Sequence, residues 1–177
     1  MKVLIISTNR EKLPFPVVPI GAAKIVGALR KSGHVVDFLD LCFSRNIRRS
    51  IRKKVMQFHP DVIGLSIRNL DNCAYVQSHA YFEGDRKIVR MIRSVSNVPI
   101  VIGGSAVSVA PGELAAYLDV DYAFAGEGER SFRAFLSASA ETEPCQWNIY
   151  RMGNITRSRN RRCNQCRSII CLWPGNP

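Results

Sequence analysis

Five short runs of apolar residues recur along the chain, and each is followed by a segment with the polarity pattern of a helix. The runs cover residues 2–7, 35–39, 62–66, 99–104 and 122–126. Their apolar residues are nearly continuous, whereas a strand with one face in water alternates apolar and polar positions. The pattern therefore predicts five strands with helices on both faces.

The segments between the runs have the spacing of helices. Residues 19–33 place side chains at intervals of three or four and stop at Gly33, a typical C-terminal cap. The members of this predicted helix row are Ile20, Ala23, Val26, Gly27 and Arg30. Further helices are predicted over residues 44–58, 83–95, 112–118 and 129–138.

Strands that alternate with helices are typical of an α/β fold with a parallel sheet and right-handed crossovers. We expect a flavodoxin-like, doubly wound, five-stranded sheet of order 2-1-3-4-5. This domain is predicted to cover residues 1–140. Residues 141–177 form a short C-terminal extension, in which "WNIYRMGNITRSRN" around Gly153-Asn154 indicates a β-hairpin.

Two connections are longer than joining requires. Residues 8–19 follow the first strand, and residues 68–82 follow the third. Short connections are normal in α/β units, and long ones commonly bind ligands. In the expected strand order both lie at the carboxyl ends of the strands, where such folds bind their ligands. We expect a ligand between these two loops.

Glycines follow the fourth and fifth strands. Gly103 and Gly104 follow one, and Gly126-Glu127-Gly128-Glu129 follows the other. Glycine is the ordinary residue of a turn. Beside two long loops, however, a glycine pair favours a wide, flat ligand that rests against bare backbone.

Three familiar ligand classes fit these motifs poorly. A dinucleotide fingerprint would follow the first strand and would have a third glycine where Ser131 stands. A phospho-acceptor receiver domain would end its third strand with an aspartate, where this chain has Ser66. A flavin mononucleotide site would have a loop rich in small hydroxyl residues in place of "TNREKLPFPVVP". A nucleotide-binding enzyme stays open as a third function, because a fold alone does not define function.

The net charge of +11 raises nucleic-acid binding as a second function. Six basic residues fall within about three helical turns, which is a possible phosphate-binding face. No aromatic residue is interleaved with them, as a nucleic-acid platform would require, so a solvated helix is the favoured interpretation. The six are Arg45, Arg48, Arg49, Arg52, Lys53 and Lys54.

The opening residues "MKVLIIS" are too short for a signal peptide or a membrane span, so we expect a cytoplasmic protein with no membrane partner. Cys42 and Cys73 stand alone in the domain, and no disulfide framework is expected. Four cysteines lie in the extension, at 145, 163, 166 and 171. They contain one close pair, whereas a structural zinc site normally uses two, so a disordered basic end is favoured and no metal ligand is assigned.

The ordered set "PIGAAKIVGALRKSGHVVDFLDL", "DVIGLSIRNLDN", "PIVIGGSAVSVAPGE" and "DVDYAFAGEGERSF" resembles the N-terminal cobalamin-binding domain of B12-dependent radical S-adenosylmethionine (SAM) proteins. The resemblance covers roughly residues 1–136, and the ordered set is more specific than any single motif. It implies a cobalamin (B12) cofactor. A [4Fe-4S] cluster and SAM are expected only in full-length relatives.

The resemblance also implies which residues meet the cofactor. Ser66 resembles the serine whose hydroxyl faces the dimethylbenzimidazole tail, and the glycine pair resembles the one that lets this tail lie beside the sheet. Residues implied near the tail or its nucleotide loop are Gly103, Gly104, Ser105, Gly126, Glu127, Gly128 and Glu129. Residues implied along the corrin ring are Asn9, Pro14, Pro16, Pro19, Arg68, Asn69, Leu70, Asp71 and Asn72.

No Asp-x-His-x-x-Gly follows the first strand, so the resemblance implies a cofactor bound base-off, without a histidine on cobalt. His34 is predicted to be structural, at the opposite edge of the sheet. His59, before Pro60, is predicted to be extended and to end a helix. His79 is the one candidate that stays open, although an exposed loop histidine is usually just solvated.

Full-length relatives continue into a barrel whose Cys-x-x-x-Cys-x-x-Cys loop holds the cluster. Here the last three cysteines are spaced Cys-x-x-Cys-x-x-x-x-Cys, and too few residues remain for a barrel. We therefore expect a shortened relative that is inactive alone, with a separate radical SAM protein as a conceivable partner.

Overall fold

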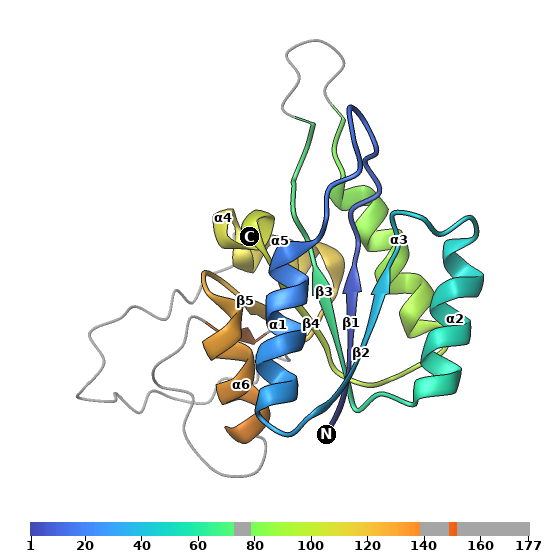
Figure 1. The fold of residues 1–177 in the computed structure, drawn as a ribbon. Coiled ribbons are helices and arrows are strands. Elements are labelled where there is room, and N and C mark those ends of the chain that lie inside the picture. The colour runs from blue at the N-terminus through green and yellow to red at the C-terminus, as the bar shows by residue number, and fades with distance from the viewer. Residues whose placement is uncertain (73–78, 139–148, 152–177) are drawn as a thin grey trace, which may run out of the picture.

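The computed structural model describes residues 1–72, 79–138 and 149–151 (Figure 1). The strands are β1 (Lys2–Ser7), β2 (Val35–Asp40), β3 (Val62–Ser66), β4 (Ile100–Gly103), β5 (Tyr122–Phe124) and β6 (Ile149–Arg151). The helices are α1 (Ile20–Lys31), α2 (Ile47–Phe58), α3 (Phe82–Arg93), α4 (Ser105–Val109), α5 (Pro111–Leu118) and α6 (Gly128–Ala138).

The strands form one sheet in the order β2-β1-β3-β4-β5-β6. The first five are parallel, which confirms the predicted order 2-1-3-4-5. The sixth strand, β6, pairs antiparallel with β5 and lies in the segment predicted as a hairpin. The other half of that hairpin and all four cysteines of the extension lie outside the described residues.

Helices cover both faces of the sheet, as the apolar strands predicted. On one face, Val3, Ile5 and Val62 pack against α1 and α6. On the other face, Leu4, Ile63 and Ile102 pack against α2, α3 and α5. In Figure 1, α1 and α6 stand in front of the sheet, while α2 and α3 stand to its right. Alternate residues of each strand therefore enter different cores, and the sheet is doubly wound.

Capping residues explain where α2 begins and ends, and they correct one prediction. The side chain of Asn46 accepts a hydrogen bond from the amide of Arg49 (2.9 Å) and so begins α2. His59 ends α2 as predicted, but it is left-handed (φ 50°) rather than extended, because its amide closes the helix on the Val55 carbonyl. The predicted helix over residues 19–33 is confirmed as α1, whose buried residues are Ala22, Val26 and Leu29.

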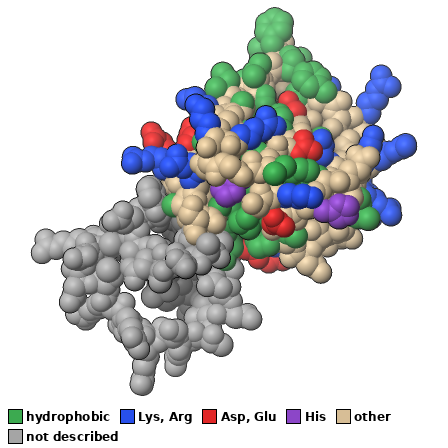
Figure 2. Space-filling model, turned by 60° about the horizontal axis from the view of Figure 1, so that its bottom comes forward, with side chains coloured by type: hydrophobic (Ala, Val, Ile, Leu, Met, Phe, Trp, Pro, Cys, Tyr) green, Lys and Arg blue, Asp and Glu red, His purple; other side chains and the backbone are tan. Residues whose placement is uncertain are grey.

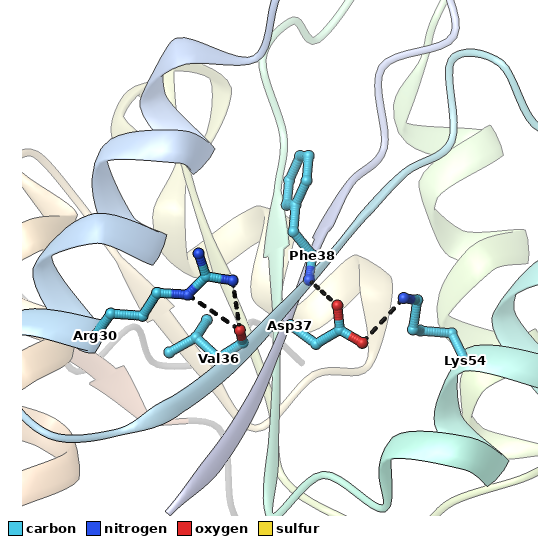
Figure 3. Close-up of polar contacts among 5 residues, drawn as sticks. All are labelled: Arg30, Val36, Asp37, Phe38 and Lys54. Carbon is cyan, nitrogen blue, oxygen red and sulfur yellow. Dashed lines mark hydrogen bonds and ion pairs between the residues drawn. The ribbon is translucent and has the colours of Figure 1, made fainter.

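The edge strand β2 is held from both sides (Figure 3). The guanidinium of Arg30, from α1, donates two hydrogen bonds to the carbonyl oxygen of Val36 (3.2 and 2.8 Å). The carboxylate of Asp37 pairs with Lys54 of α2 (2.9 Å) and accepts the amide of Phe38. A backbone acceptor on an edge strand is thereby occupied, which disfavours pairing with another chain.

Candidate functional site

Two long loops leave the carboxyl ends of β1 and β3. Their described parts, residues 8–19, 67–72 and 79–81, rise together from the same end of the sheet (Figure 1). A hydrogen bond joins them, from the Tyr81 hydroxyl to Oε2 of Glu11 (3.0 Å). The sequence predicted both loops and their common edge but gave no sign of this contact.

The first loop is organised around one carboxylate. Oε1 of Glu11 accepts the amides of Lys12 (2.9 Å) and Leu13 (3.0 Å), and the Glu11 amide donates to the side chain of Asn9. The hydrogen bond from the Leu13 amide, with those from Tyr81 and Lys12, lowers the pKa of Glu11. A charged Glu11 therefore fixes the conformation of the loop and ties it to its neighbour.

The end of the first loop exposes apolar side chains. Leu13 is 81% exposed, Phe15 78% and Val18 71%, and the predicted site residues Pro14 and Pro16 are exposed as well. Figure 2 shows hydrophobic side chains gathered at the top of the molecule, while Lys and Arg side chains lie on its flanks. Exposed apolar side chains gathered in one place mark a contact surface.

The second loop forms a two-stranded ribbon. The Tyr81 amide donates to the Leu70 carbonyl (2.8 Å), and the Asn72 amide donates to the His79 carbonyl (3.1 Å). The side chain of Asn72 also accepts the His79 amide (2.9 Å), and Asp71 bridges to the opposite strand of the ribbon. Residues 70–72 are therefore held in the stem of a projecting ribbon, at the expected edge.

The first residues of this loop are hydrogen-bonded to Gly103 and to α4. The amide of Ile67 donates to the Gly103 carbonyl (2.8 Å), and Ser105 Oγ donates to the Arg68 carbonyl (2.6 Å). The side chains of Arg68 and Asn69 are exposed. The predicted residue Ser105 thus uses its hydroxyl to join α4 to the loop, and α4 itself was too short to be predicted.

The three histidines lie in different places. His34, half-buried in the α1–β2 turn at the amino ends of the strands, has its pKa lowered by burial and by the N-terminal charge. His59 follows α2 at that same end, which leaves neither of them near the long loops. His79 lies in the ribbon, with its ring edge-on to Tyr81 at 5.5 Å.

Three small residues form a row across neighbouring strands, where these strands end. Ser7 is in register with Ser66, and Ser66 is in register with Gly103. All three belong to the sheet face that α1 and α6 cover, because side chains two residues apart on a strand point to the same face and Ile5 and Val101 lie in that core. Ser66 Oγ makes no hydrogen bond with any other described residue. The site thus has a side without bulky groups, which we call the small-residue row.

The two predicted glycines have different roles. A Cβ atom on Gly103 would make only an ordinary contact with Phe124, at 3.8 Å or more, and Gly103 is partly exposed. A Cβ on Gly104 (φ +113°) would collide with the backbone carbonyl oxygen of Ile67. Gly104 is therefore required by the protein's own packing, and Gly103 is not.

The two glycines of the Gly-Glu-Gly-Glu segment also differ: one has free space beside it, and the other allows two helices to pack closely. Gly126 has a positive φ (+82°), no atom near its missing Cβ, and an amide bound to Ser108 Oγ of α4 (2.9 Å). Gly128 lets α6 approach α1, because a Cβ there would lie 2.8 Å from Cδ1 of Ile25. Glu127 is exposed and Glu129 is partly exposed.

A buried carboxyl group lies on the opposite face of the same edge. Asp85, in the first turn of α3, is 4% exposed, and its burial raises its pKa to about 6, against a hydrogen bond from Thr8. The amide and hydroxyl of Thr8 both donate to the Ser66 carbonyl (3.2 and 3.3 Å). Sequence reasoning missed Thr8 and Asp85; a lone acidic residue on the apolar side of a predicted helix was the available signal.

The basic segment begins after the carboxyl end of β2 and extends along α2, on the sheet face opposite to the small-residue row. Arg48, Arg49, Arg52 and Lys53 are exposed on α2, while Lys54 is paired with Asp37. In the part of the chain that the structure describes, no cluster of His, Cys, Asp and Glu suited to a metal ion is found. No helix in the described ranges is long and apolar enough to cross a membrane.

The fold agrees with comparisons to known proteins. The sequence matches the B12 binding domain over residues 6–136, and the chain therefore belongs to that family. This confirms the family expected from the ordered motifs.

Relatives of known structure support the assignment. The chain is 26% identical over 134 residues to a tryptophan 2-C-methyltransferase of Streptomyces laurentii, covering 75% of this chain and 22% of that one. A radical S-adenosylmethionine methyltransferase from Kitasatospora setae, with cobalamin and a [4Fe-4S] cluster bound, superposes with a TM-score of 0.78 at 25% identity. That match covers 85% of this chain and 27% of the methyltransferase. The cobalamin-dependent radical enzyme OxsB, with aqua-cobalamin bound, has the same fold (TM-score 0.66, 20% identity, 84% of this chain and 20% of OxsB). The chain thus spans about a quarter of the length of these relatives or less.

Proposed function

We propose that this chain binds cobalamin at the carboxyl edge of its sheet. The observation that carries the proposal is the small-residue row, in which Ser7, Ser66 and Gly103 are in register and Gly103 is partly exposed without a side chain. In this proposal the nucleotide tail lies along the row, on the face covered by α1 and α6. A flat tail is accepted there because Gly103 has no side chain.

The corrin ring is proposed to lie on the two loops. Asn9, Pro14, Pro16 and Pro19 border it from the first loop, and residues 68–72 border it from the second. The apolar end of the first loop suits a large macrocycle, and the Tyr81–Glu11 hydrogen bond holds both loops in place beforehand. Gly126 to Glu129 are proposed to border the nucleotide loop. Gly104 and Ser105 are proposed to support the site, Gly104 by its close packing on Ile67 and Ser105 by the hydrogen bond from its hydroxyl to Arg68.

We further propose that the cofactor binds base-off and that no histidine of this chain coordinates cobalt. The end of β1 offers Ser7, Thr8 and Asn9, and none of these supplies an imidazole. When bound, cobalamin would supply a reactive cobalt centre, and this chain would bind and orient it. Catalysis is assigned to a [4Fe-4S] and SAM-binding part, which the matched relatives combine with this domain.

A titration with hydroxocobalamin tests the proposal. Purified protein should retain the corrin absorbance after desalting, and its visible spectrum should shift to that of the base-off form. Free cofactor in the desalting eluate, with an unchanged spectrum, would refute binding. A retained base-on spectrum, or histidine-nitrogen coupling in the electron paramagnetic resonance spectrum of the cob(II)alamin form, would refute the base-off part alone.

A matched pair of variants tests the position of the site. Gly103→Val adds a side chain to the row and should weaken cobalamin binding at least about tenfold. Gly27→Val, at a helical glycine with no atom within 4 Å of its missing Cβ, should leave affinity unchanged. Equal affinities for the two variants would place the cofactor elsewhere.

The nucleic-acid alternative uses a different surface and has a different signature. Binding by the exposed cations of α2 would weaken steeply as salt concentration rises, because counterions are released from the phosphates. Cobalamin binding should vary little with salt. Cobalamin affinity that stays constant from low to high salt, without retention of DNA or RNA, would support the first function over the second.

A further inference from the structure

A second row of the sheet lies directly below the small-residue row. It is formed by Ile5, Gly64 and Val101, which are in register on neighbouring strands and share the face under α1 and α6. Two residues along a strand correspond to about 6.6 Å, so this row lies roughly one aromatic ring deeper than Ser66. Both rows contain one glycine, in adjacent strands.

The space above Gly64 is filled more tightly than the space above Gly103. A Cβ on Gly64 would lie 2.8 Å from Cδ1 of Ile5 and 2.9 Å from Cε1 of Phe132. The edge of the Phe132 ring, from the second turn of α6, therefore rests on the bare backbone of β3. A ligand that entered beside Gly103 and moved one row deeper would therefore meet this ring.

Phe132 is held in position by its neighbours. It is 4% exposed, and its ring centroid lies 5.3 Å from that of Phe124 and 6.2 Å from that of Phe135. Tilted aromatic contacts of this kind favour a defined ring orientation. Its two aromatic neighbours hold the Phe132 ring in one orientation, so it presents a fixed surface to a ligand that enters from the carboxyl edge.

We propose that Phe132 forms the floor of the nucleotide-tail channel and determines which terminal base the domain accepts. This inference rests on the proposed function. A flat heterocyclic base reaches the ring after passing the small-residue row and packs against it. The ring therefore favours corrinoids that end in an aromatic base and limits how deeply that base enters.

The proposal is tested with two corrinoids, cobalamin and cobinamide, the latter having the corrin ring but no nucleotide tail. Wild-type protein should bind cobalamin more tightly than cobinamide. Phe132→Ala should weaken cobalamin binding about tenfold, the upper range for an aromatic contact, and change cobinamide binding less than about twofold. Phe132→Leu, which keeps most of the buried volume, should show the same selective loss at smaller size.

The controls separate this role from a purely structural one. Phe58→Leu makes the same change at the end of α2, in the core on the other face of the sheet, and should leave both affinities unchanged. A loss that Phe132→Leu shows equally for both corrinoids, or a Phe132→Leu variant with unchanged affinity for cobalamin, would overturn the role of Phe132. Equal wild-type affinities for cobalamin and cobinamide would also overturn it while leaving corrinoid binding intact. Failure of the wild type to bind either corrinoid would instead refute the proposed function.

Discussion

The two ends of the sheet are built on different principles. At the amino ends of the strands, connections are short, and carboxylates hold the backbone: Asp121 accepts the amide of Ile100 (2.7 Å) and pairs with Arg93 (2.6 Å). At the carboxyl ends, long loops rise beside a partly exposed glycine, and apolar side chains face water. At the amino edge, backbone amides and charged side chains have partners within the protein, whereas the carboxyl edge presents exposed apolar side chains that a ligand could cover. Stability and binding should therefore separate between the two edges.

The largest effect is expected at a carboxyl-edge glycine that serves packing alone. Gly104→Ala should lower the free energy of unfolding by about 3 kcal/mol or more, because its Cβ collides with the Ile67 backbone at a positive φ. Gly103→Ala should change it by less than about 1 kcal/mol, since the nearest atom lies at 3.8 Å. Urea denaturation measures both. Similar losses for the two variants would show that the adjacent glycines do not differ in role.

The buried carboxyl of Asp85 should make stability depend on pH. Its pKa in the fold, about 6, exceeds its ordinary value of 3.8, so the folded state binds the proton more tightly than the unfolded state. The contribution of Asp85 to the free energy of unfolding is therefore fully present below about pH 4 and is lost as the pH rises to about 6 and above. The total loss is about 3 kcal/mol. Asp85→Asn should remove that decline and match or exceed wild-type stability at pH 7. Parallel stability curves for the two proteins would contradict this assignment.

At the amino edge, loss of a carboxylate should affect stability without affecting binding. Asp121→Ala leaves the amide of the buried Ile100 without its acceptor and should cost about 2 kcal/mol of unfolding free energy. Asp61→Ala should cost less, because Asp61 and its partner amide on Lys2 are exposed. Cobalamin affinity should be unchanged in both. A clear loss of affinity in Asp121→Ala would mean that the two edges are coupled.

The smallest effect is expected where the two long loops meet. Tyr81→Phe removes the hydrogen bond to Glu11, with a loss of stability of about 1 kcal/mol or less. Cobalamin affinity should fall a few-fold, because the loops are then less well ordered before binding. Tyr117→Phe, whose ring packs on Phe82, is the matched control and should leave affinity unchanged. An unaltered affinity in Tyr81→Phe would limit this contact to a structural role.

The sheet could be predicted because its signal is local. The runs at 2–7 and 62–66 coincide with β1 and β3, and the continuous apolarity of the strands follows from their burial on both faces. The helical spacing over residues 19–33 correctly predicted α1 but does not define its buried face, because Ile20 is 62% exposed at the carboxyl edge. His59 was misjudged because capping of α2 outweighed the preference of a residue before proline.

The site could be predicted only in outline. The loop lengths and the glycines can be read directly from the sequence, and the structure places them at the predicted carboxyl edge. Gly104 differs from Gly103 because it packs against the backbone of Ile67. The space above Gly64 is filled by Phe132, which is far along the chain. Contacts between distant residues, such as Tyr81 with Glu11 or Thr8 with Asp85, leave no local pattern in a single sequence.

The antiparallel strand β6 comes from beyond residue 140 and covers the outer side of β5. A protein engineered to stop before residue 149 would expose the backbone groups of Tyr122 and Phe124 to other molecules. Such a shortened domain should precipitate or self-associate at high concentration, even with its cofactor-binding residues complete. Recombinant versions meant for biophysical work should therefore retain residues 149–151.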